Sequence, residues 1–288
     1  MRSTERPHAS SEPRRGTLDV DGHAIAYKLR GRGDPLVLIA GTGYPGATWP
    51  SEVLAPLAAR HTVLTFDHRG TGATPSSAER YSTRLFARDA LALIEGLGLE
   101  PAHVLGHSMG GRVAQWMALE RPDRVRSLVL AATGPGQFRD DRPVTRGVPV
   151  HAVVELVDKG YERYMRDHIR ATFFTPDFAE AQPDVVARLH ETFWSHRPDL
   201  ENYLRHVVAR QEHQTADRLG EIRVPTLVLI GDRDTVAMGT GVHTEQSDYL
   251  LSHIASASKR VIEGASHGFF WSHPQRTVEI LLEWTAAH

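Results

Sequence analysis

The 288-residue chain contains no cysteine, which excludes disulfides, thiolate metal sites and a cysteine nucleophile. Lysine occurs only at Lys28, Lys159 and Lys259, and a formal net charge of −2 gives no sign of the basic face of a nucleic-acid-binding protein. No apolar run approaches the roughly 18 residues that cross a membrane. The sequence also has no H-E-x-x-H pattern and no tight His/Asp cluster, so we expect neither a metal nor a cofactor.

The N-terminal segment, MRSTERPHASSEPRR, is polar and holds two prolines without an apolar stretch. It lacks the apolar centre of a secretory signal, and we expect residues 1–15 to form a disordered tail. The remaining composition is ordinary for a globular protein, with 41% hydrophobic and 24% charged residues over a length that can bury a large core. The cytoplasm is the expected location, and no membrane partner is expected.

Apolar runs alternate with helical patterns along most of the chain. PLVLIAG, HTVLTFD, PAHVLGHS and VRSLVLAAT have the continuous apolar character of strands buried on both faces. The alternation ends near residue 134, and only helical patterns follow until VPTLVLIGDRD restores the strand pattern. This order predicts an α/β core over residues 16–134 and 219–288, with a mostly parallel sheet flanked by helices, and an inserted helical cap over residues 135–218.

One turn carries the clearest chemical signal. In LGHSMGG, the pattern Gly106-x-Ser108-x-Gly110 stands between a predicted strand and a predicted helix. Glycines at these positions let the two backbones approach closely, and the tight turn lifts the serine hydroxyl above the sheet. We therefore predict that Ser108 is a nucleophile.

A serine nucleophile needs a base, and the base needs an acid that orients it. His267, in GASH, follows the last predicted strand and is the best candidate base, whereas His107 adjoins the serine but should point away from its hydroxyl. In GDRD, Asp232 and Asp234 compete for the role of the acid. We favour Asp234, because it lies further into the loop and can reach over the strand ends.

A glycine pattern earlier in the chain has two interpretations. Gly41, Gly43 and Gly46 spell G-x-G-x-x-G after an apolar run, which is the fingerprint of a dinucleotide-binding turn. Asp67 ends the next apolar run, about where a ribose-binding acid is expected. Against this, Pro45 fits poorly in a helix that opens on a pyrophosphate. The other interpretation is that these glycines shape a loop beside the catalytic serine.

The segments GTGYPG, FDHRGTGAT, GHSMGG, GDRD and GASH, in this order, resemble the α/β-hydrolase-fold superfamily over residues 17–286. The resemblance is to serine hydrolases with an inserted helical cap, among them esterases, enol-lactonases and C–C bond hydrolases. It implies a Ser-His-Asp triad and an oxyanion hole formed by the backbone N–H groups of Thr42 and Met109. The chain departs from the family at Ala40, where a histidine is common.

The resemblance implies a hydrolase that cleaves a carboxylic ester, a lactone or a related carbonyl substrate through an acyl-enzyme. Non-hydrolytic work on the same fold, such as elimination or acyl transfer, and ligand binding with little turnover are the alternatives. The many aromatic residues of the cap predict a small, mostly apolar substrate, and a homodimer is compatible with the sequence. The expected substrate-binding side chains are those of Tyr44, Phe173, Trp194 and Phe269.

Overall fold

The computed structural model describes residues 13–139, 146–236 and 241–288. Its centre is an eight-stranded sheet with the strand order β1-β2-β4-β3-β5-β6-β7-β8. The pairs β1–β2 and β2–β4 are antiparallel, and all pairs from β4 to β8 are parallel. The strands are β1 (Arg14–Val20), β2 (His23–Arg30), β3 (Asp34–Ile39), β4 (His61–Phe66), β5 (Ala102–His107), β6 (Val125–Ala131), β7 (Thr226–Gly231) and β8 (Ala257–Ile262).

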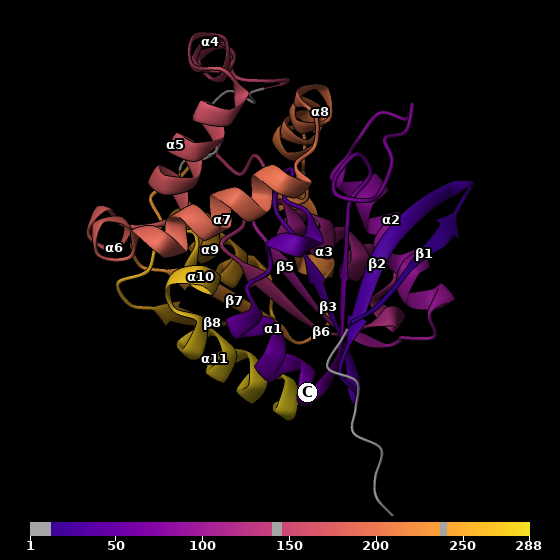
Figure 1. Ribbon diagram of the computed structural model, residues 1–288. Coiled ribbons are helices and arrows are strands. Elements are labelled where there is room, and N and C mark those ends of the chain that lie inside the picture. The colour runs from indigo at the N-terminus through magenta and orange to yellow at the C-terminus, as the bar shows by residue number, and fades with distance from the viewer. Residues whose placement is uncertain (1–12, 140–145, 237–240) are drawn as a thin grey trace, which may run out of the picture.

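Helices cover both faces of this sheet (Figure 1). Helices α1 and α11 pack together on one face, and α2 and α3 pack together on the other, which α9 also covers. The strands between these layers, β5 and β7 above all, are buried along their whole length, as their continuous apolar runs predict. The core helices are α1 (Ser51–Ala58), α2 (Thr83–Gly96), α3 (Met109–Glu120), α9 (His243–His253), α10 (Phe269–Ser272) and α11 (Pro274–Ala287).

Between β6 and β7 the chain leaves the sheet and forms five described helices. They are α4 (Val150–Lys159), α5 (Tyr161–Phe173), α6 (Pro176–Ala181), α7 (Pro183–His196) and α8 (Leu200–Gln211). Figure 1 shows them beyond one end of the strands, over the loops that follow β3, β5, β7 and β8. The helical pattern around residues 152–169 is divided into two helices, because Gly160 adopts a φ of 75°. We call α4 to α8 the cap.

The start of the chain differs from the sequence prediction. Strand β1 begins at Arg14, so Arg14 and Arg15 belong to the sheet and not to the tail expected over residues 1–15. Their backbones pair with Leu29 and Lys28 of β2, which a count of polar residues could not reveal. The rest of that tail, residues 1–12, lies outside the described residues.

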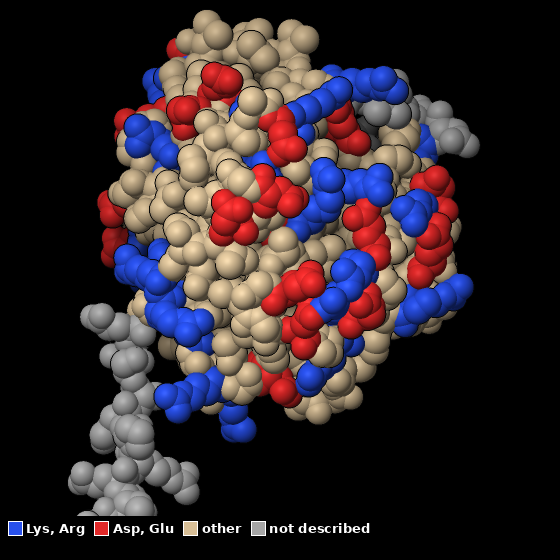
Figure 2. Space-filling view, turned by 90° about the vertical axis from the view of Figure 1, so that its right-hand side faces the viewer, with Lys and Arg blue, Asp and Glu red and all other residues tan. Residues whose placement is uncertain are grey.

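The surface carries mixed charge. In Figure 2, which faces the side of β1, β2 and α2, positive and negative side chains are interspersed without a broad field of one sign. Within the described ranges, no helix combines the length and the apolar character that crossing a bilayer requires.

Candidate active site

The turn at Ser108 joins β5 to α3 with a strained backbone. Ser108 has a φ of 56° and a ψ of −119°, outside the regions that non-glycine residues normally adopt. A side chain at Gly106 would collide with the backbone of Gly110, and one at Gly110 would collide with the carbonyl of Ile39. The glycines therefore allow α3 to begin directly against the ends of β3 and β5. This geometry is the reason why the sequence places glycine on both sides of the serine.

The strained turn presents the Ser108 hydroxyl to the loop after β3. Ser108 is 7% exposed, and a Cβ atom built on Gly41 would lie 3.7 Å from its Oγ. The Oγ donates no hydrogen bond to a described residue, so it is free to rotate. The backbone N–H groups of Thr42 and Met109 also donate to no described backbone carbonyl. Both N–H groups are therefore unpaired among the described residues, and the oxyanion hole that the resemblance implies stays a prediction.

The loops after β7 and β8 bring Asp234 and His267 together. The Asp234 Oδ2 lies 2.8 Å from the His267 Nδ1, and both side chains are buried. With Nδ1 donating to the carboxylate, Nε2 of His267 keeps a free lone pair, as a base requires. Asp232 has another role, since its Oδ1 accepts a hydrogen bond of 2.7 Å from the Gly264 N–H. The structure therefore places Asp234, and not Asp232, against the candidate base.

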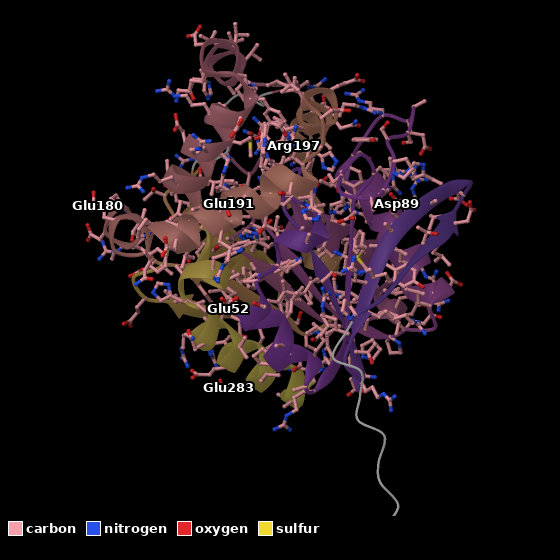
Figure 3. All side chains as sticks on the ribbon, viewed as in Figure 1. Glu52, Asp89, Glu180, Glu191, Arg197 and Glu283 are labelled. Carbon is pink, nitrogen blue, oxygen red and sulfur yellow. The ribbon has the colours of Figure 1, made fainter. Side chains whose placement is uncertain are left out.

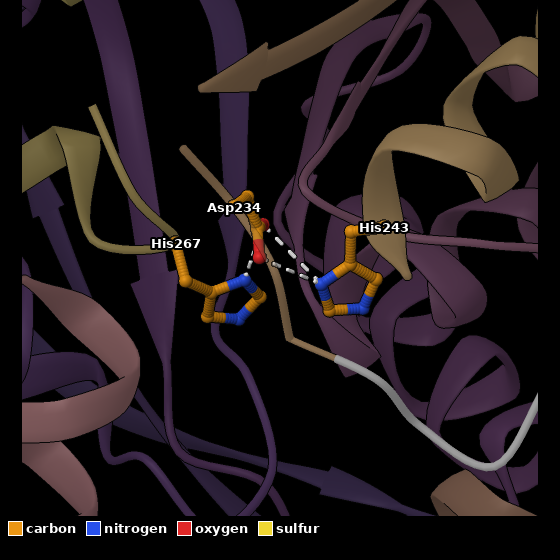
Figure 4. Close-up of side chains that lie close together, drawn as sticks. All are labelled: Asp234, His243 and His267. Atoms are coloured by element: carbon orange, nitrogen blue, oxygen red, sulfur yellow. Dashed lines mark hydrogen bonds and ion pairs between the residues drawn. The ribbon is translucent and has the colours of Figure 1, made fainter. Parts of the chain in front are cut away.

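A second imidazole occupies the other side of Asp234 (Figure 4). The Nδ1 of His243, on α9, lies 3.3 Å from Oδ1 and 3.2 Å from Oδ2 of Asp234, and its ring stacks on His267 at 4.8 Å. The expectation that the chain has no tight His/Asp cluster is wrong, because the fold brings these three residues within 4.8 Å of one another. A sequence scan missed His243 because it comes from α9, a helix without a strong apolar pattern.

The two imidazoles determine the charge of the cluster. Burial by itself would raise the pKa of Asp234, but His267 and His243 together lower it below its ordinary range. Burial lowers the pKa of His243 to about 4. At neutral pH His243 is therefore a neutral ring, and its Nδ1–H donates to the anionic carboxylate of Asp234. These hydrogen bonds account for the short distances without a metal ion.

His107 connects the serine turn to the His267 loop. Its Nε2 lies 3.0 Å from the backbone carbonyl of His267, and the two ring centroids are 4.7 Å apart. The ring is buried, and burial lowers its pKa well below the usual value. His107 therefore supports the loop as a neutral donor.

The glycine-rich loop after β3 does not form a dinucleotide site. It leads into a short 3₁₀ turn, Gly46–Thr48, and not into the helix that a pyrophosphate would need. Asp67 accepts hydrogen bonds from the Gly46 N–H at 2.7 Å and the Ala73 N–H at 2.9 Å. Its carboxylate therefore binds two loops together and is not available for a ribose.

The predicted substrate-binding aromatics fall into different places. Phe173, at the end of α5, lies 5.0 Å from the ring of Tyr44 and 5.4 Å from that of His267, so Phe173 and Tyr44 flank the site. Phe269 is fully buried beneath the His267 loop, between His107 and Phe270, as a core residue.

Trp194 lies away from this site, contrary to the prediction. Its ring packs against Tyr161 and His190, and the Arg197 guanidinium lies 3.8 Å above it. In Figure 3, the labels of Glu191 and Arg197 mark the C-terminal part of α7, the helix that carries Trp194. The helical spacing of α7 directs Trp194 to a surface between α5 and α7, a detail that the sequence pattern alone does not fix.

A cavity of about 710 Å³ lies under the cap, between α4, α5, α8 and the loop that carries Asp234. Its walls are formed in part by Leu156, Leu204, Val207 and Val236. This volume suits a small organic molecule.

The comparisons with known proteins agree with the fold. The family model described as alpha/beta hydrolase fold matches residues 34–274. RutD of Azorhizobium caulinodans, a protein named for carbamate hydrolysis, is 31% identical over 259 residues, which cover 90% of this chain and 93% of that protein.

Two solved structures are similar over nearly the whole chain. A hydrolase from Pseudomonas aeruginosa has 26% identity and a TM-score of 0.80, covering 94% of this chain and 98% of its own. The enol-lactonase from Burkholderia xenovorans has 24% identity and a TM-score of 0.81, covering 94% of this chain and 100% of its own.

Proposed function

The chain belongs to the alpha/beta hydrolase fold family and is a hydrolase, and from this premise we propose that it cleaves a carboxylic ester, a lactone or a related carbonyl compound through an acyl-enzyme on Ser108. One observation carries the proposal. The strained turn at Ser108 and the Asp234–His267 pair lie at the same edge of the sheet, where β5, β7 and β8 end.

In the first step, Ser108 Oγ attacks the substrate carbonyl carbon while His267 Nε2 takes the hydroxyl proton. Asp234 stays ionised throughout; it holds the His267 tautomer and stabilises the imidazolium that forms. As the tetrahedral intermediate collapses, the bond to the leaving group breaks and His267 returns the proton to that group. Water then attacks the acyl-enzyme by the same route in reverse, releasing the acid and restoring Ser108.

The negative charge that develops on the carbonyl oxygen needs fixed donors. The N–H groups of Thr42 and Met109 supply them, and both donors are held in place before the substrate arrives. Met109 is also the first residue of α3, so the positive end of the helix dipole points to the same oxygen.

The cavity under the cap is the proposed substrate site. Its lining combines apolar residues, Leu156, Leu204 and Val207 among them, with polar ones. Phe173 follows Thr172 of this lining, and its ring contacts that of His267. The names of similar proteins, a carbamate hydrolase and an enol-lactonase, belong to the same carbonyl chemistry.

A fluorophosphonate probe tests this proposal directly. We expect it to label Ser108 once per chain and the Ser108→Ala variant not at all, as read by peptide mass spectrometry. Turnover in ¹⁸O-labelled water should then place one ¹⁸O atom in the acid product. If the probe labels Ser108 but the product contains no ¹⁸O, the reaction is acyl transfer or elimination. If the probe does not label Ser108, a serine nucleophile is ruled out.

A further inference from the structure

Two arginines, Arg112 and Arg210, are buried close to the candidate active site and have no acidic partner among the described residues. Arg210, on α8, is 9% exposed, and its guanidinium donates no hydrogen bond to a described residue and forms no ion pair with one. Arg112, one helical turn beyond Ser108 on α3, is 2% exposed. Its Nη1 donates to the Arg210 carbonyl at 2.6 Å, and its Nη2 has no partner.

This arrangement is unusual, because a buried cation normally has a carboxylate beside it. The same chain provides a contrast in Arg69, which is buried but forms a two-point pair with Asp89 at 2.8 Å. Burial lowers the pKa of Arg210, and the nearby Tyr203 and Tyr164 oppose this shift only in part. A guanidinium nevertheless stays protonated in proteins, so Arg210 keeps an uncompensated positive charge.

The Arg210 side chain lines the cavity under the cap. The same cavity is bordered by Thr235, next to Asp234, and by Thr172, whose carbonyl accepts a hydrogen bond of 3.2 Å from Ser266 beside His267. Tyr203, another lining residue, packs against Gly43 of the loop that holds the proposed oxyanion donors. The cavity that holds the unpaired guanidinium is therefore lined by neighbours of the proposed acid, of the His267 loop and of the oxyanion loop.

The charges around Arg210 divide into an outer and an inner group. Glu155 and Asp167 line the cavity, but their side chains are about half exposed and both lie near Lys159, at 3.9 Å and 3.1 Å. The inner wall has instead the Tyr164 hydroxyl and the ring of His168, a residue whose pKa burial lowers to about 4. Among the described lining residues, the two acids thus lie near Lys159, whereas Arg210 has only neutral polar groups beside it.

We propose that Arg210 binds a carboxylate carried by the substrate, so that the enzyme acts on acid-bearing esters, lactones or diketones and not on fully neutral ones. A guanidinium fork matches a carboxylate with two parallel N–H···O bonds. The apolar walls hold the chain between this carboxylate and the scissile carbonyl. The cleavage of such substrates rests on the proposed function. The binding of their carboxylate by Arg210 does not, because binding can be measured without turnover.

The test compares each acid ester with a neutral copy of itself. Mono-p-nitrophenyl esters of succinate, glutarate, adipate and pimelate are assayed beside their methyl esters, which differ only in the masked carboxylate. For the best chain length, the wild type should prefer the acid in kcat/KM. Arg210→Gln should reduce this preference about 10- to 100-fold, the range of a charge-assisted hydrogen-bonded pair. Arg210→Lys, which keeps the charge without the fork, should fall between.

Arg166→Gln is the matched control, because Arg166 lies on α5, pairs with Glu162 at 2.8 Å and is exposed. It removes the same charge from the cap and should keep the wild-type preference. The melting temperature of Arg210→Gln should equal or exceed that of the wild type, because the variant removes an uncompensated buried charge. The proposal would be overturned if the wild type preferred the neutral methyl ester to the acid in kcat/KM, or if Arg210→Gln kept the wild-type preference for the acid.

Binding to the Ser108→Ala variant separates this inference from the proposed reaction. Calorimetry should show that mono-p-nitrophenyl glutarate, or the best homologue, binds more tightly than its methyl ester, and that adding Arg210→Gln removes the difference. This result would stand even if Ser108 proved not to be the nucleophile. Equal binding of acid and methyl ester, or competition by inorganic phosphate as strong as by glutarate, would overturn the carboxylate assignment.

Discussion

The Asp234→Asn variant tests the acid of the proposed triad, and Asp232→Asn is its control two residues away. Asp234 is fully buried and accepts hydrogen bonds from the Nδ1 atoms of His267 and His243. Asp232 accepts only the Gly264 N–H and is partly exposed. Both substitutions replace an aspartate by an asparagine, so a difference in kcat between the two variants depends on the position of the residue alone.

The expected magnitude follows from these contacts. An asparagine replaces one carboxylate oxygen by an NH₂ donor and removes the negative charge, so the two imidazoles next to Asp234 must compete for one acceptor oxygen. If the amide donates to Nδ1 of His267, the proton moves to Nε2, and the ring can no longer accept the proton of Ser108. In proteases with this triad the same change costs about 10⁴ in kcat. That factor corresponds to about 5.4 kcal/mol in the barrier.

For Asp234→Asn we therefore expect kcat on a p-nitrophenyl ester to fall about 10³- to 10⁴-fold. Asp232→Asn keeps an oxygen that can accept from Gly264, and we expect a loss below about threefold. Circular dichroism and melting temperature confirm that both variants are folded. If Asp234→Asn kept more than a tenth of the wild-type kcat, or if Asp232→Asn had the larger loss, the assignment would be refuted.

Three further predictions follow from the structure. Ser108→Ala should lower kcat about 10³- to 10⁶-fold, and adding His267→Ala should cost little more because the residues act as a unit; additive losses would contradict this. Phe173→Leu should raise KM for long acyl esters about tenfold more than it raises KM for an acetate ester, because Phe173 lies beside the proposed base. Trp194 lies outside the site, so Trp194→Leu should leave the order of KM values in a series of acyl chain lengths unchanged. Burial lowers the pKa of His206 to about 4, whereas the unfolded imidazole titrates near 6.5. Between these values the unfolded state binds more protons, so the free energy of unfolding falls as the pH drops. In urea unfolding, His206→Gln should reduce the slope of this free energy against pH by on the order of 1 kcal/mol per pH unit, and an unchanged slope would disprove a neutral buried ring.

Local patterns were sufficient for the parts of the molecule whose structure is decided locally. Continuous apolar runs indicated the buried strands. Asp-Gly is a pair typical of hairpin turns, and Asp21-Gly22, with φ values of 52° and 79°, forms the turn between β1 and β2. Serine is typical of the position before a helix, and the Ser82 side chain caps α2 by accepting a hydrogen bond from the Leu85 N–H. The glycines around Ser108 predicted a tight turn because only glycine fits that spacing.

Features that depend on distant packing could not be predicted in the same way. His243 reaches Asp234 only because α9 packs beside β7. Arg210 gave no signal in the sequence, since an arginine in an amphipathic helix is normally exposed. Tertiary packing buries it: its carbonyl contacts Arg112 on α3, and its side chain lines the cavity under the cap. For Trp194, the helical pattern established an aromatic on α7 but not the direction that it faces.

The cap and the proposed base are held together, which limits how the cap can work. The Phe173 carbonyl, at the end of α5, accepts a hydrogen bond of 2.8 Å from the Gly268 N–H, and the Thr172 carbonyl accepts one of 3.2 Å from Ser266 Oγ. These two bonds lie on both sides of His267. Lifting the whole cap from the sheet would break them and release the base, so substrate entry that required it would also disable the catalyst. We therefore expect the cavity walls on α4 and α8, and the free face of α5, to determine which substrates enter and bind. The end of α5 stays fixed to the sheet domain and supports the loop of the proposed base.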